Sequence, residues 1–218
     1  MIKKVKQLLN ELLDEVEKGA SEEPELVPVD LEEILAAATA ASPELKVVGL
    51  FSDVNEENVA ELVHGILYLD EANKAKSKKQ RKPIEFYVST YGGNADDMFA
   101  LYDIMSKVKE TSEIHTIGVG KVMSAGVLLL AAGTKGKRRI GKNCRVMIHS
   151  VMGGNHGSLH NMMNEMEAIE QIQDMYCDAL IANSNLTKKQ LKKMLERKVN
   201  VYLSAEEAIE LGIADEIM

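Results

Sequence analysis

GVGKVMSAGVLLLAAG, residues 118–133, places a single serine, Ser124, between two different apolar patterns. Residues 114–119 (IHTIGV) have the pattern of a β-strand, whereas residues 127–132 (VLLLAA) are too apolar for a surface helix and too short to span a bilayer. The second run therefore predicts the start of a buried helix. Ser124 would lie at its N-terminus, where outward-pointing N–H groups and the helix dipole favour negative charge. That position suits a catalytic nucleophile, and it equally suits an ordinary N-capping serine.

Strand and helix patterns alternate on both sides of this stretch. Strands are predicted at 46–51, 84–89, 114–119, 145–149 and 199–203. Further helices are predicted at 55–75, 95–108, 160–183 and 187–196. A last short helix begins at a Ser204–Glu207 capping box and ends at Gly212. Because parallel strands need long crossover connections, the alternation predicts an α/β fold with mainly parallel strands. The helix over 160–183 is long and rich in methionine on one face, so we expect it to protrude and pack on another subunit.

The first 45 residues follow a different pattern. Residues 1–18 have apolar side chains at helical spacing, residues 21–28 are acidic and contain two prolines, and a capping box precedes a short helix over 31–40. The sequence therefore predicts a helical N-terminal extension and linker over residues 1–45 and an α/β domain over residues 46–218. The extension either packs on the main domain or binds a partner, and its sequence favours neither.

Composition excludes several classes of function. The chain has 218 residues and a net charge of −8, which argues against a nucleic-acid-binding surface. Its two cysteines, Cys144 and Cys177, have no metal-binding spacing and fit a reducing cytoplasm. Charged residues interrupt the N-terminal apolar positions, and no segment has the length and apolarity of a membrane span. We therefore expect a cytoplasmic protein without a metal, a cofactor, a nucleic-acid partner or a membrane anchor.

Three predicted strand ends carry residues with catalytic chemistry. Gly92–Gly93 and Ser124 each follow a predicted strand, and His149 ends one. If these strands are parallel neighbours, the three ends converge at one rim of the sheet, where α/β proteins place their sites. Acyl transfer needs a nucleophile, a base and N–H donors for the oxyanion, which Ser124, His149 and the N–H groups of Gly93 and Ala125 would supply. Each residue also has a purely structural interpretation, and the spacing identifies no residue to orient the imidazole.

Five motifs together resemble the proteolytic subunit of Clp protease, over about residues 47–218. They are YGGNADDMFALYDIM (91–105), GVGKVMSAGVLLLAAGTKGKRRI (118–140), NCRVMIHS (143–150), MGG (152–154) and YLSAEEAIELGIADEI (202–217). The resemblance implies a Clp/crotonase-like α/β fold and a serine peptidase that works as a tetradecamer of two stacked heptameric rings. It also implies an ATP-driven AAA+ unfoldase as a partner, and a protruding handle helix, here the helix over 160–183, that interlocks the rings.

The same resemblance implies a role for each candidate residue. It implies that Ser124 is the nucleophile, His149 the general base and Asn200 the residue that orients the imidazole. It also implies that Gly93 and Ala125 donate to the oxyanion and that Gly153 and Gly154 pair with the substrate backbone.

Two departures from the family pattern bear on activity. Asn200 stands where the family usually has Asp, and an amide offers no negative charge to the imidazolium that forms during catalysis. In a serine protease triad, the Asp-to-Asn change lowers kcat by about 10⁴. Glu85, Arg139 and Gly141 stand where the family's cleft for unfoldase loops usually carries apolar side chains. We therefore expect a weak peptidase with altered docking of an unfoldase.

Four functions remain open at this point. The first is a self-compartmentalising serine endopeptidase that cleaves peptides or unfolded proteins. The second is a weakly active or regulatory subunit that modifies a companion Clp protease through mixed rings, which Asn200 favours. The third is a crotonase-like acyl-CoA enzyme, although that class needs no Ser–His pair. The fourth is a Ser–Lys peptidase in which Lys121 or Lys142 acts as the base.

Overall fold

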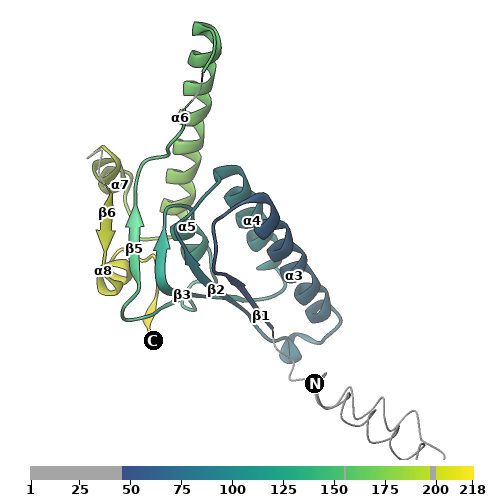
Figure 1. Ribbon diagram of the computed structural model, residues 1–218. Helices are drawn as coiled ribbons and strands as arrows, with labels where there is room; N and C mark the ends of the chain where they lie inside the picture. The colour runs from purple at the N-terminus through teal and green to yellow at the C-terminus, as the bar shows by residue number, and fades with distance from the viewer. Residues whose placement is uncertain (1–45, 155, 197–199) are drawn as a thin grey trace, which may run out of the picture. The chain divides into compact units, whose positions relative to one another are not determined.

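The computed structural model describes residues 46–154, 156–196 and 200–218, and Figure 1 shows its ribbon. The extension predicted over residues 1–45 lies outside the described residues. In chain order the described elements are β1 (Val47–Leu50), α3 (Glu56–Lys74), the 3₁₀ turn η1 (Lys78–Gln80), β2 (Ile84–Thr90), α4 (Ala95–Val108), β3 (Ile114–Met123), α5 (Ala125–Ala131), β4 (Arg139–Ile140), β5 (Arg145–Ile148), α6 (Leu159–Ala182), α7 (Lys188–Leu195), β6 (Val201–Leu203), α8 (Ala205–Glu210) and β7 (Glu216–Ile217). Each strand and helix predicted after residue 45 is present, with ends that differ by a few residues.

The strands form one mostly parallel mixed sheet. Its order is β1-β2-β3-β4-β7, with β5 beside β3 and β6 beside β5. Every pairing is parallel except that of β5 with β6, which is antiparallel. The predicted α/β fold is thus confirmed, and the architecture is that of the Clp/crotonase fold. The sequence does not predict β4 or β7, because two residues are too few to show an alternating pattern.

The long strand β3 positions the rest of the site. β2 lies along one side of β3, whereas on the other side β4 pairs with Ile117–Gly118 and β5 pairs with Lys121–Met123. β3 therefore has different neighbours along its length, and it ends directly before Ser124. The carboxyl ends of β2, β3 and β5 consequently meet at one rim of the sheet, as the parallel arrangement predicts.

Helix α5, which follows Ser124, lies inside the protein. All seven of its residues are buried, which explains why its sequence is apolar all round. It packs against β2, β3 and β5 on one side and against α4 and α6 on the other, while α3 packs on α4 and β1 (Figure 1). A helix enclosed on all sides fixes the position of its first residue, and therefore the position of the serine before it.

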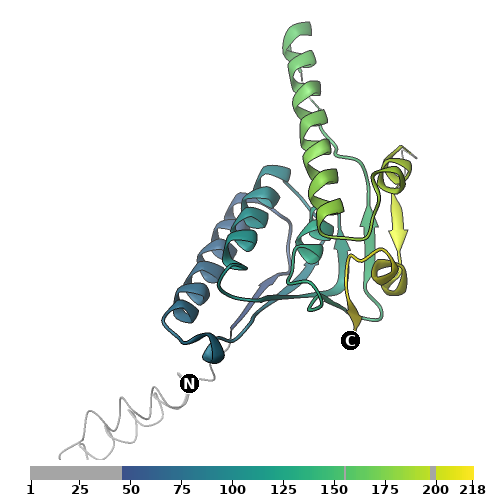
Figure 2. The ribbon, with the colours of Figure 1, turned by 180° about the vertical axis from the view of Figure 1, so that it is seen from behind.

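Helix α6 extends past the other elements of residues 46–218, as Figures 1 and 2 show. Only Tyr176 and Leu180 among its residues are buried, and both lie in its second half. Its exposed surface carries large apolar side chains, with Leu159, Met162, Met163 and Met166 on one face of the first half and Met175 in the second half. The expectation that this helix protrudes is confirmed, and its packing on another subunit stays a prediction.

A buried ion pair ties the C-terminal strand to the middle of the chain. Arg138 is only 2% exposed, and its guanidinium lies 2.5 Å from the Asp215 carboxylate. Arg138 also donates hydrogen bonds to the backbone carbonyls of Ala131, at the end of α5, and Asn183, just after α6. Burial alone would raise the pKa of Asp215, but the hydrogen bonds from Arg138 outweigh it and lower that pKa. This pair therefore joins β4, α5, α6 and β7.

Candidate active site

Ser124 has the most unusual backbone in the described part of the chain. Its φ of 54° and ψ of −122° make it the one non-glycine residue there with a positive φ. It occupies the N-cap position of α5, but its side chain accepts no capping hydrogen bond. An ordinary N-cap has an extended backbone and an accepting side chain, so that interpretation of Ser124 is wrong. Strained residues of this kind cost about 1–3 kcal/mol and cluster at functional sites.

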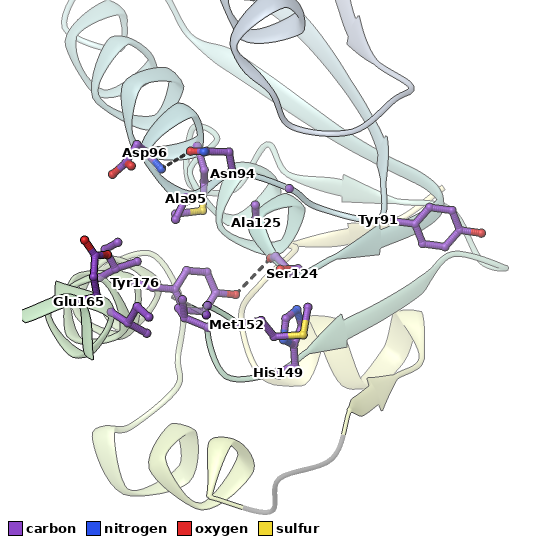
Figure 3. Close-up of a pocket in the computed structure, with 17 residues that line it drawn as sticks. Tyr91, Asn94, Ala95, Asp96, Ser124, Ala125, His149, Met152, Glu165 and Tyr176 are labelled. Carbon is purple, nitrogen blue, oxygen red and sulfur yellow. Dashed lines mark hydrogen bonds between the residues drawn. The ribbon is translucent and has the colours of Figure 1, made fainter. Parts of the chain in front are cut away.

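Contacts from three elements hold Ser124 in this conformation. Its N–H donates to the carbonyl of Met147 in β5 at 2.8 Å, and its own carbonyl accepts from Val127 N–H at 3.0 Å. The same carbonyl accepts from the Tyr176 hydroxyl of α6 at 3.3 Å, the dashed line in Figure 3. Burial raises the pKa of the Tyr176 phenol, so this group stays protonated and able to donate. The side chain of Ser124 is thereby left free to point into the pocket.

Gly92 lets the chain pass close to Ser124. A Cβ at Gly92 would lie 2.5 Å from the Cβ of Ser124 and 3.0 Å from its Oγ. Its φ of +105° is also one that side chains rarely adopt. The Thr90 hydroxyl accepts from Gly92 N–H at 3.0 Å and helps to hold this turn. Glycine is therefore required at this position by both space and backbone conformation.

Gly93 and Ala125 both line the same pocket, and each has a backbone N–H group that can act as a donor. Val54 donates to the Gly92 carbonyl and accepts from Asn94 N–H, each at 2.8 Å. In an extended chain the N–H and C=O groups of successive residues face opposite edges. Gly92 and Asn94 face Val54, so the Gly93 N–H faces away from it, and no backbone acceptor meets it in the described part of the chain. Ala125 is the first residue of α5, and its N–H has no acceptor within the helix.

His149 carries the proton arrangement that a general base needs. Its Nδ1 lies 2.6 Å from the carbonyl oxygen of Ser150. A carbonyl can only accept, so Nδ1 carries a proton, and in the neutral imidazole Nε2 then keeps its lone pair. His149 is half-buried and lines the same pocket as Ser124, with Met152 beside it (Figure 3). In this structure the Ser150 carbonyl therefore holds the imidazole in the orientation that the family resemblance attributes to Asn200.

Asn200 lies next to the site but outside the pocket. The antiparallel register pairs Ile148 with Val201, so one further step places His149 opposite Asn200. Asn200 is exposed and does not line the pocket. In this structure the hydrogen-bond partner of the imidazole Nδ1 is Ser150 and not Asn200.

The pocket brings together the other six candidate residues. Its volume is about 530 Å³, and its lining includes Ser124, His149, Gly93, Ala125, Gly153 and Gly154. Neither Lys121 nor Lys142 lines it, so nothing in this geometry favours a Ser–Lys peptidase.

Contacts of the two glycines show how α6 borders the pocket. A Cβ at Gly153 would lie 2.4 Å from Cδ1 of Ile169 on α6, whereas a Cβ at Gly154 would meet nothing within 4 Å. Both glycines are exposed. The segment after β5 therefore runs against α6 at Gly153 and leaves backbone open beside the pocket.

Sequence reasoning missed the residues that support the nucleophile. The sequence around Tyr176 shows only a helical apolar pattern, and Met147 acts through its backbone carbonyl, which no side-chain pattern reports. The separation of Tyr176 and Ser124 along the chain, 52 residues, also leaves no local signal for their contact.

The surface at Glu85 and Arg139 is polar, as their residue types predict. The two side chains form an ion pair at 3.0 Å, each about one third exposed. The hydroxyl of Tyr87 lies 3.4 Å from the Glu85 carboxylate. The two opposite charges on this surface therefore neutralise each other.

The described residues contain neither a helix suited to a membrane nor a cluster suited to a metal ion. None of their helices is long and apolar enough to cross a membrane. Within the same ranges, no group of three or more His, Cys, Asp or Glu side chains is arranged to hold a metal ion.

Comparison with known proteins gives consistent matches. The model of the Clp protease family matches residues 34–218, which include the end of the segment predicted to be an extension. The chain is 36% identical over 174 residues to the ATP-dependent Clp protease proteolytic subunit 3 of Synechococcus sp. strain CC9902 and to that of strain CC9605. It is 35% identical over the same length to the subunit 3 of Parasynechococcus marenigrum strain WH8102. Each alignment covers 79% of this chain and 82% of the relative.

Proposed function

We propose that this chain, which belongs to the Clp protease family, is a serine endopeptidase subunit that cleaves peptides or unfolded proteins. The observation that carries the proposal is the backbone of Ser124. Its strained conformation leaves the hydroxyl uncapped in a pocket shared with His149 and with the N–H groups of Gly93 and Ala125. These are the parts that acyl transfer needs.

In the proposed reaction, Ser124 Oγ attacks the carbonyl carbon of the scissile peptide bond. His149 Nε2 takes the hydroxyl proton, and the N–H groups of Gly93 and Ala125 stabilise the oxyanion. His149 then gives the proton to the leaving amine as the C–N bond breaks. Water, deprotonated by the same imidazole, hydrolyses the acyl-enzyme and restores Ser124. The exposed backbone at Gly153 and Gly154 would hold the substrate as an added strand. No step requires a metal or a cofactor.

We propose that the subunits form heptameric rings that stack in pairs. The exposed apolar face of α6 supports this assembly, because a monomer would leave these methionines in water.

The relatives are named as subunits of an ATP-dependent protease, so we also propose an AAA+ unfoldase as a partner. The ion pair of Glu85 and Arg139 would make its docking surface more polar than the usual cleft. The free cysteines Cys144 and Cys177 fit a reducing cytoplasm.

We further propose that residues 1–45 form a unit apart from the α/β domain of residues 46–218 and bind a partner or a companion subunit. Deletion of residues 1–40 should then abolish partner binding while ring assembly is kept. Unchanged binding and assembly in the deleted chain would contradict this role.

A second candidate function is a regulatory subunit in mixed rings with a companion Clp protease. Asn200 in place of Asp and the polar cleft are the observations that favour it. In that case the fold would be kept for assembly and the chemistry would be weak or absent.

A fluorophosphonate probe distinguishes the two functions. The full-length chain is treated with the probe, the adduct is mapped by mass spectrometry, and Ser124→Ala serves as the control. Labelling at Ser124 alone supports the peptidase, whereas an unlabelled but assembled ring supports the regulatory subunit. The mass in solution is measured on the same sample, and a stable monomer would contradict the ring.

A further inference from the structure

The charged side chains that line the pocket are of one sign. Asp96 in the first turn of α4 and Glu165 on α6 contribute carboxylates to its wall, and neither Lys nor Arg lines it. Within the described ranges neither carboxylate forms an ion pair, since only the backbone N–H of Asp96 is engaged, by the Asn94 side chain. Lys121, outside the lining, lies over the ring of the lining residue Tyr91, 4.7 Å from its centroid.

The two carboxylates lie at a defined end of the pocket. Figure 3 shows Asp96 and Glu165 on one side of the pocket, and Ser124 and His149 together on the other. His149 protonates the leaving amine in the proposed reaction, so the leaving half of the substrate lies beside the imidazole. The acyl half therefore lies toward Asp96 and Glu165. The side chain next to the attacked carbonyl, called the P1 side chain, belongs to this half.

The lining of the same pocket also includes apolar side chains. Met98 is 2% exposed and Tyr176 is 5% exposed, and Ile172 lines the same pocket. A P1 side chain that crosses this surface needs an apolar stem, and one that ends beside Asp96 and Glu165 gains from a positive charge. Lys and Arg combine a stem of methylene groups with a terminal cation.

We propose that the pocket selects substrates with Lys or Arg at P1, so that the enzyme cleaves after basic residues. The proposal rests on the proposed peptidase function and adds the substrate class to it. Both carboxylates are exposed to solvent, so each ion pair changes the equilibrium constant by only a factor of about 1.5 to 5. The expected preference is therefore about three- to tenfold in kcat/KM, and it weakens as salt screens the charges.

The test compares two peptides that differ in charge alone. The full-length protein is given a fluorogenic peptide with Arg at P1 and the same peptide with citrulline, which keeps the shape and loses the charge. We expect kcat/KM to be about fivefold higher for the Arg peptide at low salt, and the ratio to fall toward one at 0.5 M salt. Asp96→Asn with Glu165→Gln should bring the ratio to about one even at low salt.

Two matched controls exclude a general effect of charge. Asp97→Asn and Glu167→Gln remove a carboxylate from the same helices at positions outside the pocket lining. They should keep the fivefold ratio. Because each variant is judged by the ratio of the two peptides, a uniform loss of activity cancels.

The outcomes separate this proposal from the function on which it rests. Fluorophosphonate labelling of Ser124 with a ratio of one in the unmodified protein overturns the P1 preference and leaves the peptidase standing. A ratio that survives in the double variant overturns the assignment to Asp96 and Glu165. Absence of both labelling and cleavage overturns the peptidase and the preference together.

Discussion

The two halves of the candidate site are built very differently. Ser124 stands before a helix whose seven residues are all buried, and its backbone is held from β5, α5 and α6. His149 lies directly after the short strand β5, its imidazole is held by the carbonyl of the adjacent Ser150, and the exposed Gly153 and Gly154 follow soon after. The backbone of the candidate nucleophile is anchored to buried elements, whereas the candidate base is followed by an exposed segment.

Because of this difference, we expect the geometry at Ser124 to depend on the folded chain alone and the geometry at His149 to depend also on neighbouring segments and subunits. A strained serine fixed by the core keeps its geometry as long as the domain is folded. An imidazole fixed by one local hydrogen bond responds to whatever contacts the segment after β5 and the nearby helix α6. We therefore expect reactivity toward a covalent probe to depend mainly on the fold, and turnover of peptides to depend also on assembly.

The largest effect is expected at the nucleophile itself. Ser124→Ala should abolish fluorophosphonate labelling and lower kcat by at least about 10⁴-fold, because no other group can form the acyl-enzyme. Its stability should change by less than about 0.5 kcal/mol, since the hydroxyl caps nothing. Labelling is read by mass spectrometry and stability by urea unfolding. A loss of about 1 kcal/mol or more would indicate that the side chain is a cap after all.

The second effect concerns the ion pair of Arg138 and Asp215, in which Arg138 also bonds to the end of α5. Asp215→Asn should lower the free energy of unfolding by about 3 kcal/mol, because it leaves the buried guanidinium of Arg138 without its counter-charge. The exposed pair of Lys107 and Glu110 is the matched control, and Glu110→Gln should cost less than about 1 kcal/mol. Urea unfolding at pH 7 measures both. Equal effects of the two substitutions would contradict a structural role for the buried pair.

The same ion pair predicts how stability depends on pH. The pKa of Asp215 is lowered in the folded protein, so its contribution is present above the ordinary Asp pKa of about 3.9. The contribution is lost as the pH falls through the lowered pKa and the carboxylate is protonated. Unfolding curves between pH 7 and pH 2 should therefore converge for the unmodified protein and Asp215→Asn. Curves that stay parallel would assign the stability to other groups.

The third effect concerns a donor of the oxyanion hole. A Cβ at Gly93 would lie 2.1 Å from the carbonyl oxygen of Val54, at a φ of +152°. Gly93→Ala must therefore move the backbone that carries the N–H donor, and kcat should fall by about 10²- to 10³-fold. Gly157→Ala is the control, since its Cβ would meet its nearest neighbour at 3.5 Å. Normal peptide turnover by Gly93→Ala would remove this N–H from the proposed mechanism.

Sequence patterns predicted the arrangement of the site better than its fine geometry. Alternating strands and helices were enough to bring Gly93, Ser124 and His149 to one rim, because parallel strands end on the same side. The backbone strain at Ser124 and the carbonyl that holds His149 have no side-chain signature. The pair of Arg138 and Asp215 joins residues 77 positions apart, a separation at which no local pattern reports a contact. These features arise from packing, which the order of residues along the chain does not display.

The smallest effect is expected at Asn200, and it tests the exposed half of the site most directly. Because Nδ1 of His149 donates to the Ser150 carbonyl, Asn200→Ala should lower kcat by less than about tenfold, far less than the 10⁴ of a serine protease triad. Asn200→Asp should raise kcat by up to about fivefold, as an exposed carboxylate near the imidazolium contributes about 1 kcal/mol. Peptide hydrolysis by assembled protein measures both, with the exposed Asn164→Ala on α6 as the control. A loss of 10³-fold or more in Asn200→Ala would instead mean that the amide, and not the backbone carbonyl, orients His149 during turnover.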